Sequence, residues 1–235
     1  MNLVLLEPGD LIAPRVARLT GRRLQHVREV HRASAGEELA VGLLGGPMGT
    51  GRVLRVDGEA LELALSLDRM PPPKLPLTVV LALPRPKVLD RVLVAAASLG
   101  VQRLVLLNAW KVEKAYWSSP KLAAEHLRSH LLLGLEQARD TVLPELRLAR
   151  LFRPFVEDEL GDLLAGGVGL LAHPGLGGSA PVAPGLPVTL AIGPEGGWIE
   201  PEVQSLLRAG FRPLDLGPRI LRTETALATL VGKLF

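Results

Sequence analysis

Cysteine is absent from the 235 residues of the chain, which excludes disulfide bonds, a thiol nucleophile and any zinc site built on cysteine. Aromatic residues make up only 3% of the composition, so the core must be aliphatic. No uncharged apolar run reaches the roughly eighteen residues that a membrane-spanning helix needs. The N-terminus also lacks the basic-then-apolar pattern of a signal peptide. We therefore expect a soluble, cytoplasmic protein with no membrane contact.

Lysine is scarce, with six lysines against 21 arginines, and the net charge is only +3. So small an excess does not by itself establish nucleic-acid binding, but the distribution of the arginines is uneven. Six of them fall within eighteen residues near the N-terminus, a cluster that favours contact with RNA phosphates. The alternative is a solvated helix face in an arginine-rich protein. The cluster consists of Arg15, Arg18, Arg22, Arg23, Arg28 and Arg32.

Residues 1–70 read as a small β-rich unit, because short apolar runs alternate with Gly and Asp turns. A helix is expected over 20–32, with Leu24, Val27 and Val30 facing inward. A glycine-rich irregular turn is expected over 45–51, and a hairpin around Asp57-Gly58. Strands are expected at 3–6, 38–43, 52–56 and 61–67.

The second part of the chain has a different rhythm. Prolines at 71–73 and 76 predict an extended linker over 71–76. Over 77–235, strands and helices alternate, which predicts an α/β domain with a mostly parallel sheet and helices on both faces. Strands are expected at 77–83, 101–107, 146–151, 168–172, 187–192 and 211–216, helices at 86–99, at 120–140 and from 226 to the end, and a loop at 175–187.

Two of these strands run directly into Gly-Pro loops, GPEGGW at 193–198 and GPRILRTETA at 217–226. Ligands of α/β sheets bind beyond the carboxyl ends of the strands, and glycine lets the backbone approach a ligand closely. Such loops suit a flat, neutral ligand such as an adenosine. Either loop alone is equally consistent with an ordinary strand-to-helix connection. The absence of GxGxxG and GxxxxGK[ST] argues against a dinucleotide-binding or P-loop site.

The segments IGPEGGW and LGPRILRTETA, in this order and spacing, closely resemble the RsmE family of ribosomal RNA methyltransferases in the SPOUT superfamily. This resemblance implies a C-terminal SPOUT domain with a trefoil knot, which binds S-adenosyl-L-methionine (SAM) and acts as a homodimer. It implies methylation of N3 of a uridine in 16S rRNA of the small ribosomal subunit, with S-adenosyl-L-homocysteine as product. It also implies that residues 1–70 form a PUA-like β-barrel that grips RNA, which the looser match at 26–32 supports.

By resemblance, three loops form the cofactor pocket. The expected cofactor-binding residues are Leu171, Ala172, His173, Ile192, Gly193, Glu195, Gly196, Leu216, Gly217, Arg219, Ile220, Leu221, Arg222, Thr225 and Ala226. No metal is expected, because no cysteine and no second histidine stands at ligand spacing from His173.

Methylation of N3 of uracil needs a group that removes a proton or stabilises the resulting anion, because N3 is protonated at neutral pH. We expect Arg222 to stabilise the anion or orient its phosphate, and Glu195 or Glu224 to be the base. Arg222 and Glu224 are equally consistent with a structural ion pair, within the chain or across a dimer interface. Thr223 is expected to cap the last helix.

The chain departs from the family pattern at Lys111-Lys114, Ser98-Gly100 and Glu136-Asp140, elements that we expect on the RNA side of the domain. Two alternatives therefore stay open. One is a SPOUT methyltransferase of another rRNA or tRNA nucleotide, and the other is a non-catalytic RNA-binding factor in ribosome assembly.

Overall fold

The computed structural model describes residues 2–178 and 185–235, and the chain divides into two compact units. The first unit comprises Met1–Pro73 and Leu132–Leu143, and the second comprises Lys74–Leu131 and Pro144–Phe235. The division at Pro73 falls inside the proline-rich stretch. The contribution of Leu132–Leu143 to the first unit has no signal in the sequence. Part of the expected loop at 175–187, residues 179–184, lies outside the described residues.

The first unit is built on a six-stranded sheet with the order β1-β4-β5-β6-β3-β2. β1 is parallel to β4, and the other neighbours are antiparallel. Its core is aliphatic, as the composition requires, with Leu6, Leu19 and Leu61 fully buried. The strands are β1 (Val4–Leu6), β2 (Leu11–Ala13), β3 (Val16–Leu19), β4 (Glu38–Leu43), β5 (Met48–Val56) and β6 (Leu61–Arg69), with a 3-10 helix at Pro8–Asp10.

The irregular turn expected over 45–51 is confirmed at Gly45 and Gly46, but β5 already begins at Met48. Gly49 and Gly51 both lie in β5, and Gly49 is next to a register shift against β6. A Cβ on Gly49 would lie 1.9 Å from the carbonyl oxygen of Ser66. The glycine is needed because the two backbones cross closely at this bulge.

The expected N-terminal helix is present as α1 (Gly21–His26) and a π-helical turn, Val27–His31. Leu24 and Val27 are buried as predicted, but Val30 is 64% exposed. The prediction for Val30 is wrong because a π turn holds more residues than an α turn, so the positions after Val27 rotate away from the buried stripe.

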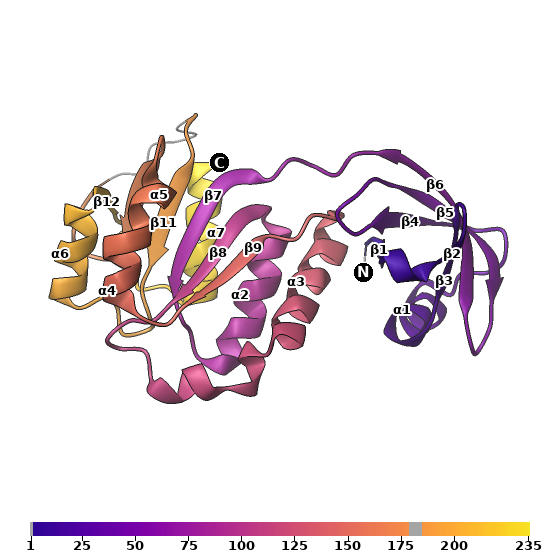
Figure 1. The fold of residues 1–235 in the computed structure, drawn as a ribbon, viewed down its shortest axis with the longest axis horizontal. Coiled ribbons are helices and arrows are strands. Elements are labelled where there is room, and N and C mark those ends of the chain that lie inside the picture. Colours follow the sequence, from indigo (N-terminus) through magenta and orange to yellow (C-terminus); the bar gives the residue numbers. More distant parts are fainter. Residues whose placement is uncertain (1, 179–184) are drawn as a thin grey trace. The chain divides into compact units, whose positions relative to one another are not determined.

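The second unit contains a sheet in which every neighbouring pair is parallel, with the order β12-β10-β11-β7-β8-β9. The α/β prediction is confirmed. Figure 1 shows α4, α5 and α6 on one side of this sheet and α2 and α7 on the other. The strands are β7 (Leu75–Ala82), β8 (Val101–Leu107), β9 (Glu145–Ala149), β10 (Val168–Ala172), β11 (Val188–Ile192) and β12 (Phe211–Leu214).

The helices that follow these strands are amphipathic, and α2 buries the predicted stripe that includes Leu89, Val92 and Leu93. The helix expected over 120–140 begins as a 3-10 turn, Pro120–Leu122, and continues as α3. The helices are α2 (Pro86–Ser98), α3 (Ala124–Ala138), α4 (Phe152–Pro154), α5 (Leu160–Leu164), α6 (Glu200–Arg208) and α7 (Thr223–Leu234), with a 3-10 helix at Lys114–Ser118 and a π-helix at Phe155–Glu159. In the described residues, no helix is both long and apolar enough to cross a membrane.

The strand order creates a switch point between β7 and β11. From β7 the chain proceeds through α2 to β8 and β9, whereas from β11 it proceeds through α6 to β12 on the other side. The connections therefore leave the carboxyl ends of β7 and β11 in opposite directions. A crevice at such a point is where α/β sheets bind their ligands.

Candidate active site

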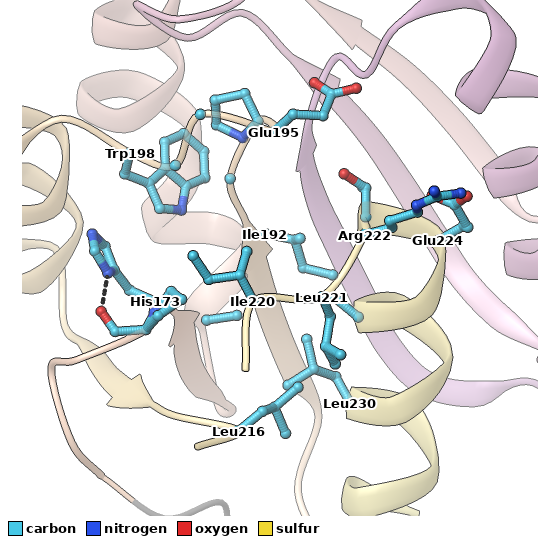
Figure 2. Close-up of a pocket in the computed structure, with 18 of the residues that line it drawn as sticks. His173, Ile192, Glu195, Trp198, Leu216, Ile220, Leu221, Arg222, Glu224 and Leu230 are labelled. Carbon is cyan, nitrogen blue, oxygen red and sulfur yellow. Dashed lines mark hydrogen bonds between the residues drawn. The ribbon is translucent and has the colours of Figure 1, made fainter. Parts of the chain in front are cut away.

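A cavity of about 850 Å³ lies at this switch point. It is bounded by the loops after β10, β11 and β12 and by the first turns of α2 and α7, as Figure 2 shows. Leu171 is fully buried and Thr225 is exposed on α7, and neither lines the cavity. The other expected residues line it: Ala172, His173, Ile192, Gly193, Glu195, Gly196, Leu216, Gly217, Arg219, Ile220, Leu221, Arg222, Glu224 and Ala226.

The β11 loop is folded tightly around Trp198. A Cβ on Gly193 would lie 3.1 Å from the Trp198 ring, so only glycine lets the ring pack there without displacement. Trp198 is 4% exposed, and its Nε1 is buried without a hydrogen-bond partner among the described residues. Glu202, on α6, is buried, and its carboxylate accepts hydrogen bonds from the backbone amides of Ile199 at 3.1 Å and Trp110 at 2.8 Å. These contacts fix the loop before any ligand binds.

Asp215 ties the β10 and β12 loops together. Its carboxylate accepts hydrogen bonds from the amides of Gly175 at 2.9 Å and Gly217 at 2.8 Å. These two amides hold the pKa of Asp215 below its usual value, because they stabilise the ionised form. Gly217 has a φ of 96°, which L-residues rarely adopt.

His173 stands at the end of β10, where its amide donates to the carbonyl of Leu214 at 3.2 Å. Its Nδ1 lies 2.8 Å from the carbonyl oxygen of Pro174, drawn as a dashed line in Figure 2. A carbonyl oxygen only accepts, so Nδ1 carries the hydrogen. In the neutral ring, Nε2 is then available as an acceptor.

The charged groups lie at the rim of the cavity. Glu195 accepts a hydrogen bond from the Arg85 amide at 3.1 Å, and Glu224 lies 3.2 Å from the guanidinium of Arg91 on α2. The partner of Glu224 in the chain is thus Arg91. Arg222 is exposed and forms no ion pair within the described residues, and Figure 2 shows it beside Glu224 at the start of α7.

The expected role of Thr223 as a helix cap is wrong. Arg222 occupies the N-cap position of α7, and Thr223 is the buried first residue of the helix. A cap is formed by the side chain of the N-cap residue, which accepts a hydrogen bond from a backbone amide of the first turn. Thr223 already belongs to that first turn.

Sequence reasoning missed the contribution of the segments after β7 and β8. Arg85, Lys87 and Arg91 line the cavity, and Lys111 reaches it to donate from Nζ to the carbonyl of Gly196 at 2.6 Å. The placement of Lys111 on the RNA side, away from the cofactor loops, is therefore corrected. Because ligands of α/β sheets bind beyond the carboxyl ends of the strands, Arg85 can be identified once β7 is known to lie next to β11.

In the first unit, three members of the arginine cluster are engaged in internal ion pairs. Arg23 donates to both carboxylate oxygens of Asp10, at 2.5 and 2.7 Å, and to the carbonyl of Leu5. Arg22 binds the buried Glu136 through two hydrogen bonds of 3.0 and 2.7 Å. Arg18 lies 3.7 Å from a carboxylate oxygen of Glu62. The remaining members, Arg15, Arg28 and Arg32, are exposed.

Comparison with known proteins identifies relatives along nearly the whole chain. The family model for the RNA methyltransferase domain matches residues 71–234. Ribosomal RNA small subunit methyltransferase E of Treponema pallidum is 32% identical over 236 residues, covering 96% of this chain and 87% of the relative. The protein of the same name from Synechocystis is 29% identical, covering 95% and 73%.

Solved structures share the fold. A Legionella pneumophila methyltransferase, solved with bound SAM, is 27% identical with a TM-score of 0.75, covering 98% of this chain and 95% of that one. Ribosomal RNA small subunit methyltransferase E of Neisseria gonorrhoeae, solved with S-adenosyl methionine, has the same TM-score at 21% identity and covers 99% and 95%. The RsmE resemblance of the two C-terminal loops is confirmed by the family model and by the relatives. The chain belongs to the ribosomal RNA small subunit methyltransferase E family, with the fold of SPOUT methyltransferases.

Proposed function

We propose that this protein transfers the methyl group of SAM to N3 of a uridine in 16S rRNA of the small ribosomal subunit. The observation that carries the proposal is the cavity at the β7/β11 switch point, formed by the GPEGGW and LGPRILRTETA loops. A relative that shares most of the chain is named ribosomal RNA small subunit methyltransferase E, and structures with the same fold were solved with the cofactor bound. The small-subunit substrate is consistent with a cytoplasmic protein.

The cavity suits an adenosine because apolar side chains line it together with the glycines of the loops after β11 and β12. Ile192, Leu216 and Leu230 supply the walls on which the adenine would pack. The loop amides and carbonyls supply hydrogen bonds for the base and ribose. The sulfonium already activates the methyl group, so the protein has mainly to align the acceptor, which is worth several kcal/mol.

During the transfer, the N3 lone pair of the uracil forms a bond to the methyl carbon. The carbon–sulfur bond breaks with its electron pair going to sulfur, which gives S-adenosyl-L-homocysteine. The N3 proton must leave, and we assign its removal to a rim carboxylate. Both carboxylates face an arginine, and Glu195 is the stronger candidate because its contact with Arg85, at 3.8 Å, is longer than the 3.2 Å contact of Glu224 with Arg91. Arg222, exposed and unpaired in the described residues, would stabilise the negative charge on the uracil.

For the first unit we propose RNA binding by a PUA-like barrel, with residues 1–70 as the RNA-binding domain, 71–76 as linker and 77–235 as the methyltransferase domain. The exposed Arg15, Arg28 and Arg32 would contact phosphates. We assign Arg18, Arg22 and Arg23 a smaller share of the phosphate contacts, because their guanidinium groups already pair with Glu62, Glu136 and Asp10.

We further propose a trefoil knot and a homodimer. After β12 at the sheet edge, residues 215–222 lead to α7, which packs on α2, the helix that follows β7. The chain must therefore pass back across β10 and β11, the path that a knot requires. Ile220 and Leu221 on this passage are 82% and 36% exposed, and we propose that a second copy covers these adjacent apolar side chains. The molar mass measured by light scattering after size-exclusion chromatography would test the dimer.

The function is tested with labelled SAM and small subunits from a strain that lacks this protein, followed by digestion and identification of the labelled nucleoside by mass. We expect label in 3-methyluridine. Label in another nucleoside would retain the enzyme class but reassign the acceptor. No label, despite measurable SAM binding, would favour the non-catalytic RNA-binding factor.

The role of Arg222 is tested in the same assay with Arg222→Ala, and Arg212→Ala on β12 is the matched control. We expect kcat to fall by about 10²- to 10³-fold, as for the loss of one charge-stabilising donor, with SAM affinity retained. Arg212 is also exposed but does not line the cavity, so its variant should keep full turnover. Unchanged turnover in Arg222→Ala would refute the assignment.

A further inference from the structure

A cluster of two histidines and an aspartate lies between α2 and α3, within the second unit. Asp90 comes from α2, and His126 and His130 stand four residues apart on α3. One ligand atom from each of the three side chains lies within 4.8 Å of the other two. All three are partly buried, with side chains that are 20 to 29% exposed. None of them lines the proposed cofactor cavity.

The hydrogen bonds of the cluster fix the orientation of His130. Its Nδ1 lies 2.9 Å from the carbonyl oxygen of His126, so Nδ1 carries the hydrogen and donates it. Its Nε2 then faces Asp90 Oδ1 at 3.8 Å. In a neutral ring that nitrogen is an acceptor, and it faces the oxygen of a carboxylate. Two acceptors oriented toward each other need a cation or a proton between them.

The two carboxylate oxygens of Asp90 have different partners. Lys121 holds Oδ2, while Oδ1 faces both imidazoles, at 2.8 Å from His126 Nε2 and 3.8 Å from His130 Nε2.

We propose that Asp90, His126 and His130 form a binding site for a divalent transition metal ion, with Zn²⁺ as the occupant. Two imidazole nitrogens and one carboxylate oxygen are a donor set that zinc accepts, with water in the fourth position. Zinc bonds of about 2.0–2.1 Å in a tetrahedron separate neighbouring ligand atoms by roughly 3.3 Å. The separations of 2.8 and 3.8 Å bracket that value, so small side-chain rotations suffice to admit the ion.

The surrounding contacts act as the outer shell that metal sites require. The His126 carbonyl orients His130 through Nδ1–H, a hydrogen bond that leaves Nε2 free to bind the ion. Lys121 fixes the carboxylate through the oxygen that the ion does not use. On binding, the ion displaces the proton that His126 Nε2 donates to Asp90, and this proton is released to solvent while Nδ1 carries the hydrogen of the ring. The site would join α3 to the helix whose first turns line the proposed cofactor cavity.

This site was not expected from the sequence. No metal was expected because neither residue lies near His173 in the chain, although His126 and His130 stand one helical turn apart on the same face of a helix. Asp90 is 36 positions away in the chain from His126. Only the packing of α2 against α3 brings the third ligand to the pair.

The test is calorimetric titration of ZnCl₂ into the full chain, freed of any affinity tag and stripped of metal with a chelator. We expect one equivalent of zinc per chain for the wild type. His130→Gln and Asp90→Asn should each weaken binding by at least about 10-fold, the lower end of the loss seen even for outer-shell partners. The matched control is His31→Gln, which removes an exposed histidine of the first unit and should retain wild-type affinity.

Two further measurements, of cobalt absorption and of SAM affinity, test the identity and the location of the site. Co²⁺ bound at the site should give visible absorption that His130→Gln abolishes, whereas Mg²⁺ should not compete, because imidazole suits zinc and cobalt rather than magnesium. SAM titration of the same folded variants should match the wild type, because the cluster lies outside the cofactor cavity. The proposal is overturned if the wild type binds no zinc, or if zinc binding survives in both His130→Gln and Asp90→Asn.

Discussion

Replacement of Gly217 by alanine should weaken SAM binding without unfolding the protein. Gly217 lies in the β12 loop that lines the cavity, has a φ of 96°, and donates its amide to Asp215 at 2.8 Å. An added Cβ would meet no atom within 4 Å. The substitution therefore introduces no clash, and its effect comes from the backbone conformation alone.

The magnitude follows from the cost of that conformation. An L-residue held at positive φ loses roughly 1–2 kcal/mol relative to glycine. The open space around Gly217 lets the free loop relax to negative φ, so the cost is incurred when the ligand requires the original loop shape. Since 1.4 kcal/mol is a factor of ten, Kd for SAM should rise by roughly 5- to 30-fold.

The assay is calorimetric titration of SAM, with thermal unfolding followed on the same samples. Gly210→Ala is the matched control, because Gly210 has a φ of 102°, equally open surroundings and no place in the cavity. It should lower Tm without changing Kd. A Kd for Gly217→Ala within twofold of the wild type would refute the view that this loop shape sets cofactor affinity.

Three further predictions concern the fold and the loops. Gly49→Ala should lower the free energy of unfolding by about 1–3 kcal/mol in urea titrations, because its Cβ would overlap the Ser66 carbonyl oxygen, whereas Gly58→Ala, with open surroundings, should change it far less. Glu136→Gln should destabilise by about 1–3 kcal/mol, because the buried carboxylate that accepts two hydrogen bonds from Arg22 is lost; equal unfolding midpoints would contradict this. The lowered pKa of Asp215 means that its stabilisation is fully present above the unfolded value of 3.8 and is lost as pH falls through the lower folded value. Acid unfolding of Asp215→Asn should show less pH dependence in that window, and identical profiles would count against the role of Asp215.

Most strands of the second unit could be predicted because their sequences are continuous apolar runs. β8 and β10 have the predicted bounds, and β7, β11 and β12 differ only at their ends. A strand that is buried on both faces shows a continuous apolar run instead of alternating polar and apolar residues. The short length of the run and its flanking glycines then distinguish it from a buried helix. The α/β class follows from the order of these elements.

Elements whose pattern is not set by burial were missed. The β2–β3 hairpin was not predicted, because all three residues of β2 are exposed and show no alternation. Gly49 and Gly51 were read as a turn because glycine more often marks turns than close strand crossings. The segment of α3 that joins the first unit depends on contacts such as Arg22 with Glu136, 114 positions apart.

The candidate site divides in the same way. The loops after β10, β11 and β12 could be found because their glycines and prolines directly follow apolar strands. Arg85 and Lys111 could not, because their place at the cavity depends on the insertion of β11 beside β7. Strand order is a tertiary property that alternation of elements leaves open.

The distribution of backbone and side-chain groups in the cavity implies that cofactor binding and methyl transfer should respond to different substitutions. The cofactor walls are loops whose shape depends on Gly217 and on hydrogen bonds to Asp215, whereas the charged groups, Arg222 among them, lie at the rim. Gly217→Ala should therefore act on Kd for SAM, and Arg222→Ala on kcat. If the two effects are independent, the double variant should show both in full, because the free energies of independent substitutions add within about 0.3–0.5 kcal/mol. A double variant that loses clearly more or less than the sum would mean that the loop shape also positions Arg222 for the transfer.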